Sequence, residues 1–386
     1  MPDHAVLTLP AYADQFLLRD DIAFLNHGSF GACPTPVFKT FQDWQLALER
    51  QPVEFLGRRF GELMAGARAK LAAYLGTSAD ALVYVPNATY GVNIVARSLD
   101  LQPGDEVLGS DHEYGAAERS WRFVCERAGA RYLSQPIAPP WHSAAEFADQ
   151  LWQGVTERTR VIFLSHITSP TALIFPLAEV CRRAREAGIM TVIDGAHAPG
   201  QLDLALDELG ADFYTGNCHK WMCAPKSAGF LHARPERQAL LHPLIVSWGW
   251  RSESPSPSQF VDYFEWRGTH DPAAYLSVPA AIDFMTERDW PAVRAAAHEL
   301  LLEAEARILE LGDQGPLSPS DQFVQLRTIP LPPCDLGALK ARLWDEHKVE
   351  VPMVGWNGGH YLRVSVQCYN GPRDIDRRIE GLKASL

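Results

Sequence analysis

The chain has 386 residues, of which 47% are hydrophobic and 21% are charged, a composition typical of a globular protein of about two or three domains. Its formal net charge of −12 argues against nucleic acid as the main partner, because phosphate backbones are bound by an excess of Lys and Arg. No window approaches the roughly 20 apolar residues of a membrane-spanning helix, and we expect no signal peptide. The sequence therefore predicts a cytoplasmic protein that binds neither membranes nor nucleic acids.

Cysteine and histidine usage gives no sign of a metal site. The seven cysteines are dispersed without a Cys-x-x-Cys pair, which is typical of reduced thiols in a cytosolic protein. The thirteen histidines form no His-Glu-x-x-His pattern. We therefore expect no metal and look for the chemistry in other residues.

The first two thirds of the chain alternate between helical and strand patterns. Apolar residues at helical spacing end at Gly76, and short apolar runs that predict buried strands follow at 81–85, 106–109, 160–165, 190–194, 212–215 and 227–232. Helical segments lie between several of these runs, among them one that begins with the capping-box pair Ser143 and Glu146. The alternation predicts an α/β fold with a mostly parallel sheet that is buried on both faces.

The composition changes at 252–258, where Ser and Pro dominate and we expect a loop near a domain boundary. Two helical stretches (about 273–285 and 290–311), strand-like runs at 322–326 and 361–366, and a last helix from Pro372 follow. We therefore predict a large α/β domain over residues 20–258 and a smaller C-terminal α+β domain over 259–386. Residues 1–19 are predicted to pack on the smaller domain.

Two polar residues that follow predicted strands have the chemistry that pyridoxal phosphate requires. Asp194 ends the strand at 190–194, at the edge where open α/β sheets bind their ligands, and Lys220 follows 26 residues later. A lysine amine can hold this cofactor as a Schiff base, and a carboxylate can keep its pyridine nitrogen protonated. A helix-capping Asp and a surface Lys are the alternative interpretation of either residue alone.

The neighbouring segments favour a phosphate-binding site. Residues 87–91 (NATYG) follow the strand at 81–85 and begin an apolar helix, so free backbone N–H groups and the positive helix end would face an anion. Asn217 and His219, just before Lys220, could donate to the same anion. Tyr114 follows the strand at 106–109 and could stack on a flat cofactor. An ordinary capped helix and a packing aromatic residue are the alternatives.

Six segments together resemble the class V aminotransferase family of fold-type I pyridoxal phosphate enzymes, and most closely its isopenicillin N epimerase-like branch, which is related to cysteine desulfurases. These segments are LNHGSFG (25–31), NATYG (87–91), SHITSPT (165–171), DGAH (194–197), HKW (219–221) and RGT (267–269). The resemblance covers nearly the whole chain. It implies a homodimer with active sites at the subunit interface.

The resemblance also implies roles for individual residues. It makes Lys220 the Schiff-base lysine, Asp194 the partner of the pyridine nitrogen, and Arg363 the clamp for the substrate α-carboxylate, a task that suits a guanidinium. The other implied cofactor contacts are Ala88, Thr89, Tyr114, Ser169, His197 (by the 3-hydroxyl side), Asn217, His219 and Thr269, the last reaching the phosphate of the other subunit. Asn26 and His27 are the remaining predicted substrate contacts.

By this resemblance we predict an amino-acid epimerase or racemase, in which Lys220 removes the α-proton and a donor on the opposite face returns one. Tyr114 or a histidine such as His112 could be that donor. A carbon–sulfur lyase shares the first step, transamination is a third reaction of the family, and a cofactor-binding protein without turnover would not need Arg363. Persulfide-forming desulfurase chemistry is not expected, because residues 351–361 contain no cysteine; Cys33 is interpreted as an inert thiol.

Overall fold

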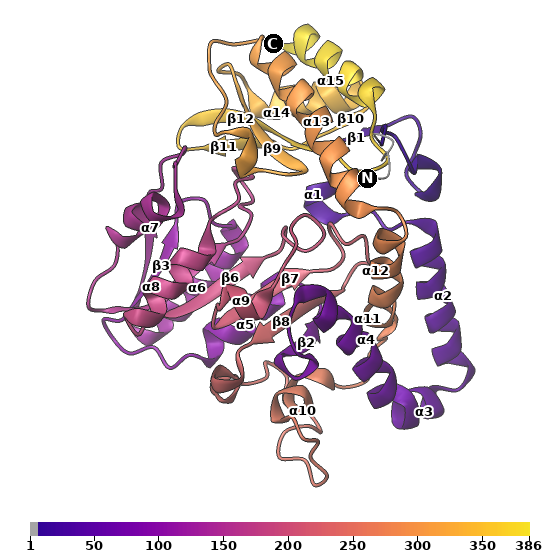
Figure 1. The fold of residues 1–386 in the computed structure, drawn as a ribbon, viewed down its shortest axis with the longest axis vertical. Helices are drawn as coiled ribbons and strands as arrows, with labels where there is room; N and C mark the ends of the chain where they lie inside the picture. Colours follow the sequence, from indigo (N-terminus) through magenta and orange to yellow (C-terminus); the bar gives the residue numbers. More distant parts are fainter. Residues whose placement is uncertain (1–6) are drawn as a thin grey trace, which may run out of the picture.

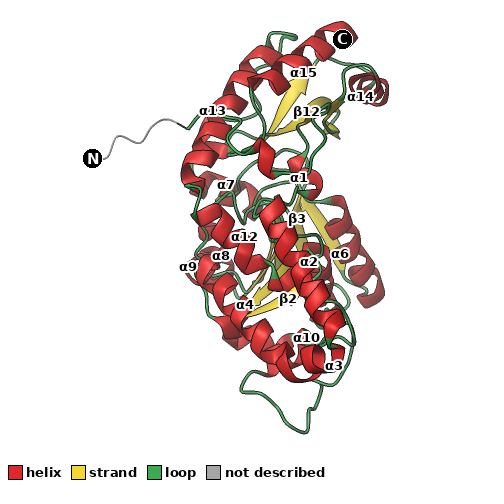
Figure 2. Ribbon diagram, turned by 90° about the vertical axis from the view of Figure 1, so that its right-hand side faces the viewer, coloured by secondary structure: helices red, strands yellow, loops and turns green. Residues whose placement is uncertain are grey.

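The structure is a computed structural model that describes residues 7–386. Residues 1–6, part of the N-terminal segment predicted to pack on the smaller domain, lie outside the described residues. A large lobe contains the central sheet, and a smaller lobe lies at the top of Figure 1. Figure 2 shows the two lobes stacked along the long axis of the molecule. Within residues 7–386, no helix has the length and apolar character needed to cross a membrane.

The central sheet has, within the described residues, seven strands in the order β2-β8-β7-β6-β5-β3-β4. These strands are β2 (Leu82–Val85), β3 (Glu106–Ser110), β4 (Arg131–Gln135), β5 (Thr159–Ser165), β6 (Met190–Gly195), β7 (Phe213–Asn217) and β8 (Gly229–Ala233). Strands β7, β6, β5, β3 and β4 are parallel neighbours, whereas β8 is antiparallel to both β7 and β2. The predicted fold class, α/β with a mostly parallel sheet, is confirmed.

Helices cover both faces of this sheet (Figure 2). The helices of the large lobe are α1 (His27–Phe30), α2 (Thr35–Arg50), α3 (Pro52–Glu54), α4 (Phe60–Leu75), α5 (Ala88–Ser98), α6 (Gly115–Ala128), α7 (Ala144–Trp152), α8 (Leu177–Glu186), α9 (Leu206–Leu209), α10 (Gln259–Glu265), α11 (Ala273–Leu276) and α12 (Val278–Thr286). Side chains of a strand alternate between faces, so Phe163 packs with α5 and α6, whereas Ile162 and Leu164 pack with α7 and α8.

The smaller lobe is built around an antiparallel sheet in the order β11-β12-β9. Its elements are β9 (Leu326–Leu331), β10 (Val349–Glu350), β11 (Met353–Trp356), β12 (Gly359–Ser365), α13 (Trp290–Leu309), α14 (Leu336–Asp345) and α15 (Pro372–Ser385), with β1 (Ala23–Phe24) pairing parallel to β10. Its core includes Leu301, Ile329, Leu362 and Ile379, together with Leu25 from the N-terminal segment. Residues close to the start of the chain therefore contribute to the C-terminal lobe.

The segment between residues 259 and 289 packs on the large sheet, although the composition change at 252–258 suggested a boundary before it. Phe260 and Phe264 of α10 belong to the apolar core on one face of the sheet, and Phe284 of α12 belongs to the core on the other. Helix α13 contributes Val293 to the large lobe and Leu301 to the smaller one. We therefore propose that the two lobes divide within α13.

Candidate active site

The carboxyl ends of the parallel strands carry polar residues that meet at one edge of the sheet. Ser165 of β5 is paired with Asp194 of β6, which is paired with Thr215 of β7. A pocket of about 200 Å³ lies at this edge, as expected for an open α/β sheet. It is lined by Ser29, Phe30, Asn87, Ala88, Thr89, Tyr114, Ser165, Ile167, Ser169, Asp194, Ala196, His197, Asn217, His219 and Lys220. Nine of the residues predicted from the sequence thus line a single pocket.

Lys220 lies in the turn after β7, and the N-terminal segment holds its backbone in place. The His27 ring donates from Nε2 to the Lys220 carbonyl oxygen at 3.0 Å. Gly31 has a φ of +73°, and a Cβ there would lie 2.1 Å from the His219 carbonyl oxygen, so only glycine allows this close approach. Burial and the nearby Arg363 guanidinium lower the pKa of Lys220 to about 8. About a tenth of the amine is therefore uncharged at pH 7, far more than for an ordinary lysine.

Asp194 is buried at the end of β6 with one carboxylate oxygen engaged. Its Oδ1 accepts a hydrogen bond from the Ala196 N–H at 2.9 Å, and Oδ2 has no hydrogen-bond partner among the described residues. Burial raises the pKa of Asp194, while the Ala196 N–H and the Lys220 ammonium oppose that shift. A protonated ring nitrogen placed beside Oδ2 would stabilise the ionised carboxylate, so the residue fits the role of a pyridine partner.

The N-terminus of α5 has donors that an anion could use. Asn87 caps the helix by accepting from the Tyr90 N–H at 2.9 Å, and the Ala88 N–H donates to Asn217 Oδ1 at 2.8 Å. The N–H of Thr89 belongs to the first helical turn and has no intrahelical acceptor. Because Asn217 Oδ1 faces the Ala88 N–H, the NH₂ group of this amide is available as a further donor. Thr89 and Asn217 therefore fit a phosphate, whereas the Ala88 N–H already has an acceptor.

His219 contributes a ring whose orientation is fixed. Its Nδ1–H donates to the Ala228 carbonyl oxygen at 2.9 Å, so in the neutral ring Nε2 is an acceptor. Burial lowers the pKa of His219 to about 4. A bound phosphate dianion would reverse this shift, since it favours the imidazolium that can donate from Nε2.

Arg363 on β12, in the smaller lobe, does not line the pocket itself but bonds to two residues that do. Its Nη1 donates to the carbonyl oxygen and the Oγ of Ser169, at 2.6 and 3.0 Å, and its Nη2 lies 3.3 Å from Ser29 Oγ. The Nε–H is buried and has no partner among the described residues. Burial lowers the pKa of Arg363 to about 10. The Nε–H is thus a donor without an acceptor behind the pocket wall, and the Nε–Nη2 edge has the geometry that binds a carboxylate with two parallel hydrogen bonds.

The structure does not bring Asn26, His27 or Thr269 into this pocket. Asn26 donates from Nδ2 to Glu350 Oε1 at 2.9 Å and accepts from Ser29 at Oδ1. His27 is fully buried behind Lys220, and its Nδ1 accepts from the Tyr369 hydroxyl at 2.8 Å. Both residues lie behind the pocket wall, so they are not placed to contact a substrate. Thr269 is exposed and away from the pocket, and its predicted contact with another subunit stays a prediction.

His112, one of the two proton donors considered, is fully engaged elsewhere. Its ring nitrogens contact Thr171 Oγ1 at 2.7 Å and the Ile137 carbonyl oxygen at 2.8 Å. Burial lowers its pKa, and the ring does not line the pocket. Tyr114 lines the pocket and is 45% exposed, so it is the better placed of the two.

The sequence analysis missed a buried carboxylate next to Tyr114. Glu113 accepts from the N–H and hydroxyl of Ser165, at 2.8 and 2.7 Å, and from the Ser110 hydroxyl at 2.5 Å. Burial raises the pKa of Glu113 to about 7. The residues around it (111–114, DHEY) are polar and show no apolar periodicity, so nothing in the sequence predicted that this side chain lies inward, behind the pocket.

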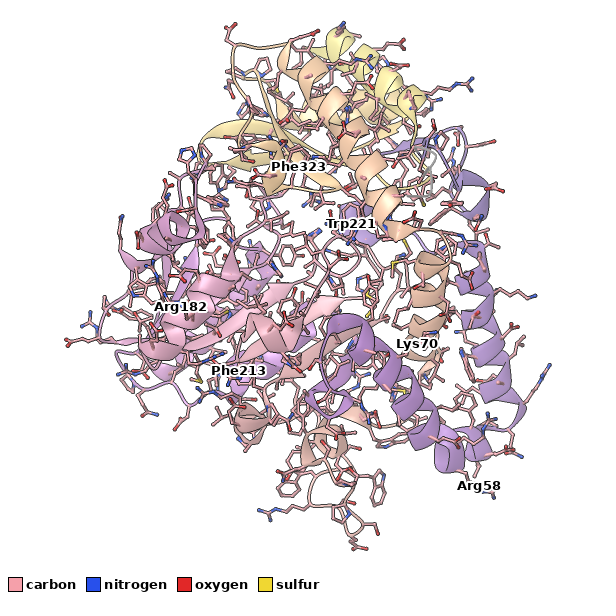
Figure 3. The ribbon with its side chains drawn as sticks, viewed as in Figure 1. Arg58, Lys70, Arg182, Phe213, Trp221 and Phe323 are labelled. Carbon is pink, nitrogen blue, oxygen red and sulfur yellow. The ribbon has the colours of Figure 1, made fainter. Side chains whose placement is uncertain are left out.

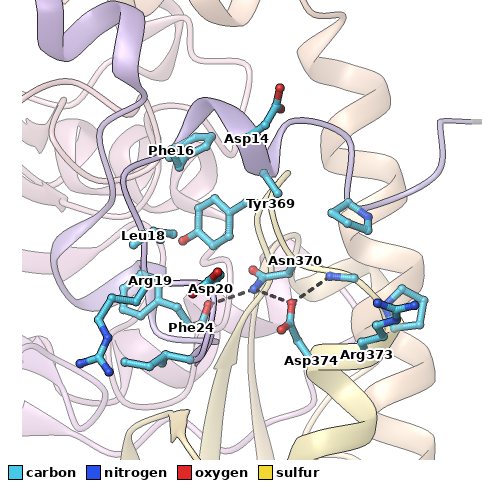
Figure 4. Close-up of a pocket in the computed structure, with 15 residues that line it drawn as sticks. Asp14, Phe16, Leu18, Arg19, Asp20, Phe24, Tyr369, Asn370, Arg373 and Asp374 are labelled. Carbon is cyan, nitrogen blue, oxygen red and sulfur yellow. Dashed lines mark hydrogen bonds between the residues drawn. The ribbon is translucent and has the colours of Figure 1, made fainter.

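A larger cavity of about 770 Å³ lies elsewhere, between residues 10–24 and the start of α15 (Figure 4). The Phe16, Leu18 and Tyr369 side chains form much of its wall. Asn370 donates to the Phe24 carbonyl oxygen and to Asp374, and Asp374 also accepts from the Gly371 N–H, which caps α15. This cavity lacks the convergent buried charges of the pocket at Lys220.

The model of the family described as aminotransferase class-V matches residues 34–377, which is most of the chain. The chain belongs to this family. The membership confirms the expected cofactor, pyridoxal phosphate, and agrees with the donors, carboxylate and lysine found in the pocket.

The curated relatives of this chain include enzymes named for two different reactions. It is 35% identical to an isopenicillin N epimerase of Amycolatopsis lactamdurans over 96% of each chain. It is 28% identical to a probable chloroplastic L-cysteine desulfhydrase of Arabidopsis thaliana, over 92% of this chain and 81% of the relative.

Solved structures share the fold at lower identity. A cysteine desulfurase from Escherichia coli matches with a TM-score of 0.80 and 21% identity over 98% of each chain. A cystine C–S lyase in complex with cysteine persulfide matches with a TM-score of 0.80 and 22% identity, over 94% of this chain and 97% of the lyase. At these identities the likeness supports the class-V fold alone.

Proposed function

We propose that the chain is a pyridoxal phosphate enzyme of the isopenicillin N epimerase type, which inverts the α-carbon of an amino acid or amino-acid derivative. The observation that carries the proposal is the meeting of Lys220 and Asp194 in one pocket, with Arg363 bonded to Ser169 in its wall. A base, a ring-nitrogen partner and a carboxylate clamp are what such a reaction needs from the protein. The similarity to isopenicillin N epimerases supports this choice among the reactions of the family.

One set of residues would hold the ring of the cofactor and another its phosphate. Asp194 would pair with the pyridine nitrogen, and Thr89, Asn217 and His219 would bind the phosphate. Tyr114 would stack on the ring. When bound, pyridoxal phosphate supplies an electron sink that stabilises negative charge on the substrate α-carbon.

The protein would then bind the substrate and move its α-proton. Arg363 would hold the carboxylate through Nε and Nη2, which orients the α-hydrogen toward the lysine. Lys220 Nζ would take this hydrogen as a proton, since its pKa of about 8 makes the amine a competent base near neutral pH. The Tyr114 hydroxyl would return a proton to the opposite side of the α-carbon.

A carbon–sulfur lyase is the second candidate, because L-cysteine desulfhydrases are also relatives of the chain. Elimination begins with the same removal of the α-proton, so the pocket residues serve both reactions. Aminotransfer is the third candidate and would return the proton to the cofactor. The 351–361 segment, which forms β11 and part of β12, supplies no cysteine for persulfide formation.

We also propose a cytoplasmic homodimer in which Thr269 of one subunit reaches the active site of the other. The exposed position of Thr269 in the single chain supports this arrangement. Mixing a Thr269→Ala chain with a Lys220→Ala chain tests it, since exchange of subunits creates one site without either substitution. Recovery of activity in the mixture supports shared sites, and a mixture as inactive as its parts contradicts them.

The reaction is tested by incubating the loaded enzyme in D₂O with a panel of L- and D-amino acids, cysteine conjugates and short peptides. Deuterium at the α-carbon together with inverted configuration supports the epimerase. Release of pyruvate with a sulfur product would contradict the epimerase assignment and favour the lyase. Transfer of the amino group to a keto acid would favour the aminotransferase.

A further inference from the structure

Trp221, the residue after Lys220, is fully buried where the two lobes meet (Figure 3). Its indole packs in an apolar cluster with Ile167 and Ala198 and lies against the His27 ring, at 4.9 Å between centroids. The indole Nε1–H donates to Nδ1 of His197 at 3.2 Å. The packing therefore fixes a donor on one side of the His197 ring.

The direction of this hydrogen bond decides the protonation of His197. An indole nitrogen can only donate, so Nδ1 of His197 is an unprotonated acceptor. Burial is the main cause that lowers the pKa of His197 well below its usual range, and the Arg363 guanidinium acts in the same direction, so the ring is neutral. Its one proton is then on Nε2, which lies 3.2 Å from Nζ of Lys220. A protonated Nε2 requires the lysine nitrogen to accept with its lone pair.

We propose that Trp221 is a positioning residue that selects the His197 tautomer and thereby favours the free amine of Lys220 over its ammonium form. The free amine is the form that attaches the cofactor and that removes a proton from the substrate. The inference rests on the proposed role of Lys220, and it holds for each of the candidate reactions.

Other charges also act on the lysine amine and remain in place when the indole is altered. Besides His197, the titratable groups around Lys220 are Asp194 on β6, Arg363 on β12, His27 on α1, Tyr114 at the start of α6 and the adjacent His219. Asp194 favours the ammonium form and Arg363 opposes it. These contributions set the background pKa, whereas the indole acts through the ring of His197.

The attachment of pyridoxal phosphate to the full-length apoprotein reports on the amine directly. Only the neutral amine attacks the aldehyde carbon, and water leaves as the covalent C=N bond forms. Measured by absorbance as a function of pH, the attachment rate should rise through a midpoint near the Lys220 pKa of about 8. Trp221→Phe retains an aromatic ring but lets His197 move its proton to Nδ1 and accept from the ammonium. The midpoint should then rise by about one pH unit, a roughly tenfold slower attachment at neutral pH.

A double-mutant comparison separates this effect from packing. In a His197→Phe background no imidazole links the indole to Lys220, so Trp221→Phe should produce no further shift in the pH midpoint of attachment. Trp290→Phe is the matched control, because it removes another buried indole donor, bonded to the Gly200 carbonyl at 3.1 Å, without touching His197. An equal shift in both backgrounds, a shift caused by Trp290→Phe, or no shift from Trp221→Phe beside the native His197 would each overturn the proposal.

Two further measurements keep the test independent of folding and of the proposed function. In the unaltered protein labelled with ¹⁵N-histidine, the NMR signals that disappear in His197→Phe belong to His197. These signals should show Nε2 protonated and Nδ1 unprotonated. The opposite tautomer would overturn the proposal without any tryptophan variant. Attachment of the cofactor to a Lys220→Ala chain would instead overturn the assignment of Lys220 itself.

Discussion

Two cavities of the molecule differ in chemistry as well as in size. The cavity beside Tyr369 measures about 770 Å³ and the pocket at Lys220 about 200 Å³. In the larger cavity the charged side chains Arg19 and Arg373 are exposed, and Asp374 is used to cap α15 (Figure 4). In the smaller pocket a partly buried lysine lies near a buried aspartate, and their pKa values are shifted by burial and by neighbouring charges. Convergent buried charge, rather than volume, marks the candidate site.

The largest effect should come from removing the amine of the smaller pocket. Lys220→Ala should abolish the absorbance of lysine-bound cofactor and lower kcat roughly 10²–10⁴-fold, because the proton acceptor is gone. Lys226→Ala is the matched control, since Lys226 is a nearby, exposed lysine that donates to the Gly31 carbonyl oxygen. Equal loss in both variants would contradict the special role of Lys220.

Tyr114→Phe should separate the two proton transfers. Loss of the hydroxyl should slow inversion about 10²-fold, while one enantiomer continues to exchange its α-hydrogen in D₂O through Lys220. Chiral chromatography and mass spectrometry of the same samples measure both. Parallel loss of exchange and inversion would show that Tyr114 acts in cofactor binding and not as the second donor.

A comparison of two arginines tests the two cavities directly. Arg363→Gln should lower kcat/KM roughly 10- to 100-fold by removing charge-assisted hydrogen bonds to the substrate carboxylate. Arg373→Gln, in the larger cavity, should leave kcat/KM unchanged. A larger loss from Arg373→Gln would move the substrate site to that cavity.

The smallest effect concerns the buried carboxylate behind the pocket. Because the pKa of Glu113 is raised to about 7 in the folded state, its neutral form stabilises the fold at low pH. This contribution is lost as pH rises from about 5 to 8, at a cost of up to about 3 kcal/mol in the free energy of unfolding. Glu113→Gln should flatten this part of the stability profile, as urea unfolding at several pH values would measure. An unchanged slope would contradict the assignment of the pH dependence to Glu113.

Local patterns predicted the strands and the residues at their ends well. Asp194 ends one predicted strand and Tyr114 lies a few residues beyond another, so their place at the sheet edge depends on short stretches of sequence. Strand β4, which is partly exposed and only weakly patterned, was missed, and the antiparallel direction of β8 depends on its pairing with β7 and β2. The run predicted at 322–326 was misplaced, since β9 begins only at Leu326.

Long-range contacts account for what the sequence analysis could not supply in the site. His27 resembled a substrate contact, but it bonds across 193 positions to the Lys220 backbone. Glu113 and Trp221 owe their importance to partners on other segments, Ser165 and His197 respectively. Hydrogen bonds between distant segments leave no local periodicity, so only the folded arrangement reveals them.

The most direct test is to identify the lysine that carries the cofactor. Borohydride reduction of the loaded enzyme fixes the C=N bond, and peptide mapping by mass spectrometry then locates the modified residue. The structure predicts a single modified peptide in which Lys220 carries the pyridoxyl group. Modification of Lys226, or of a lysine outside the pocket at the carboxyl edge of the sheet, would contradict this assignment.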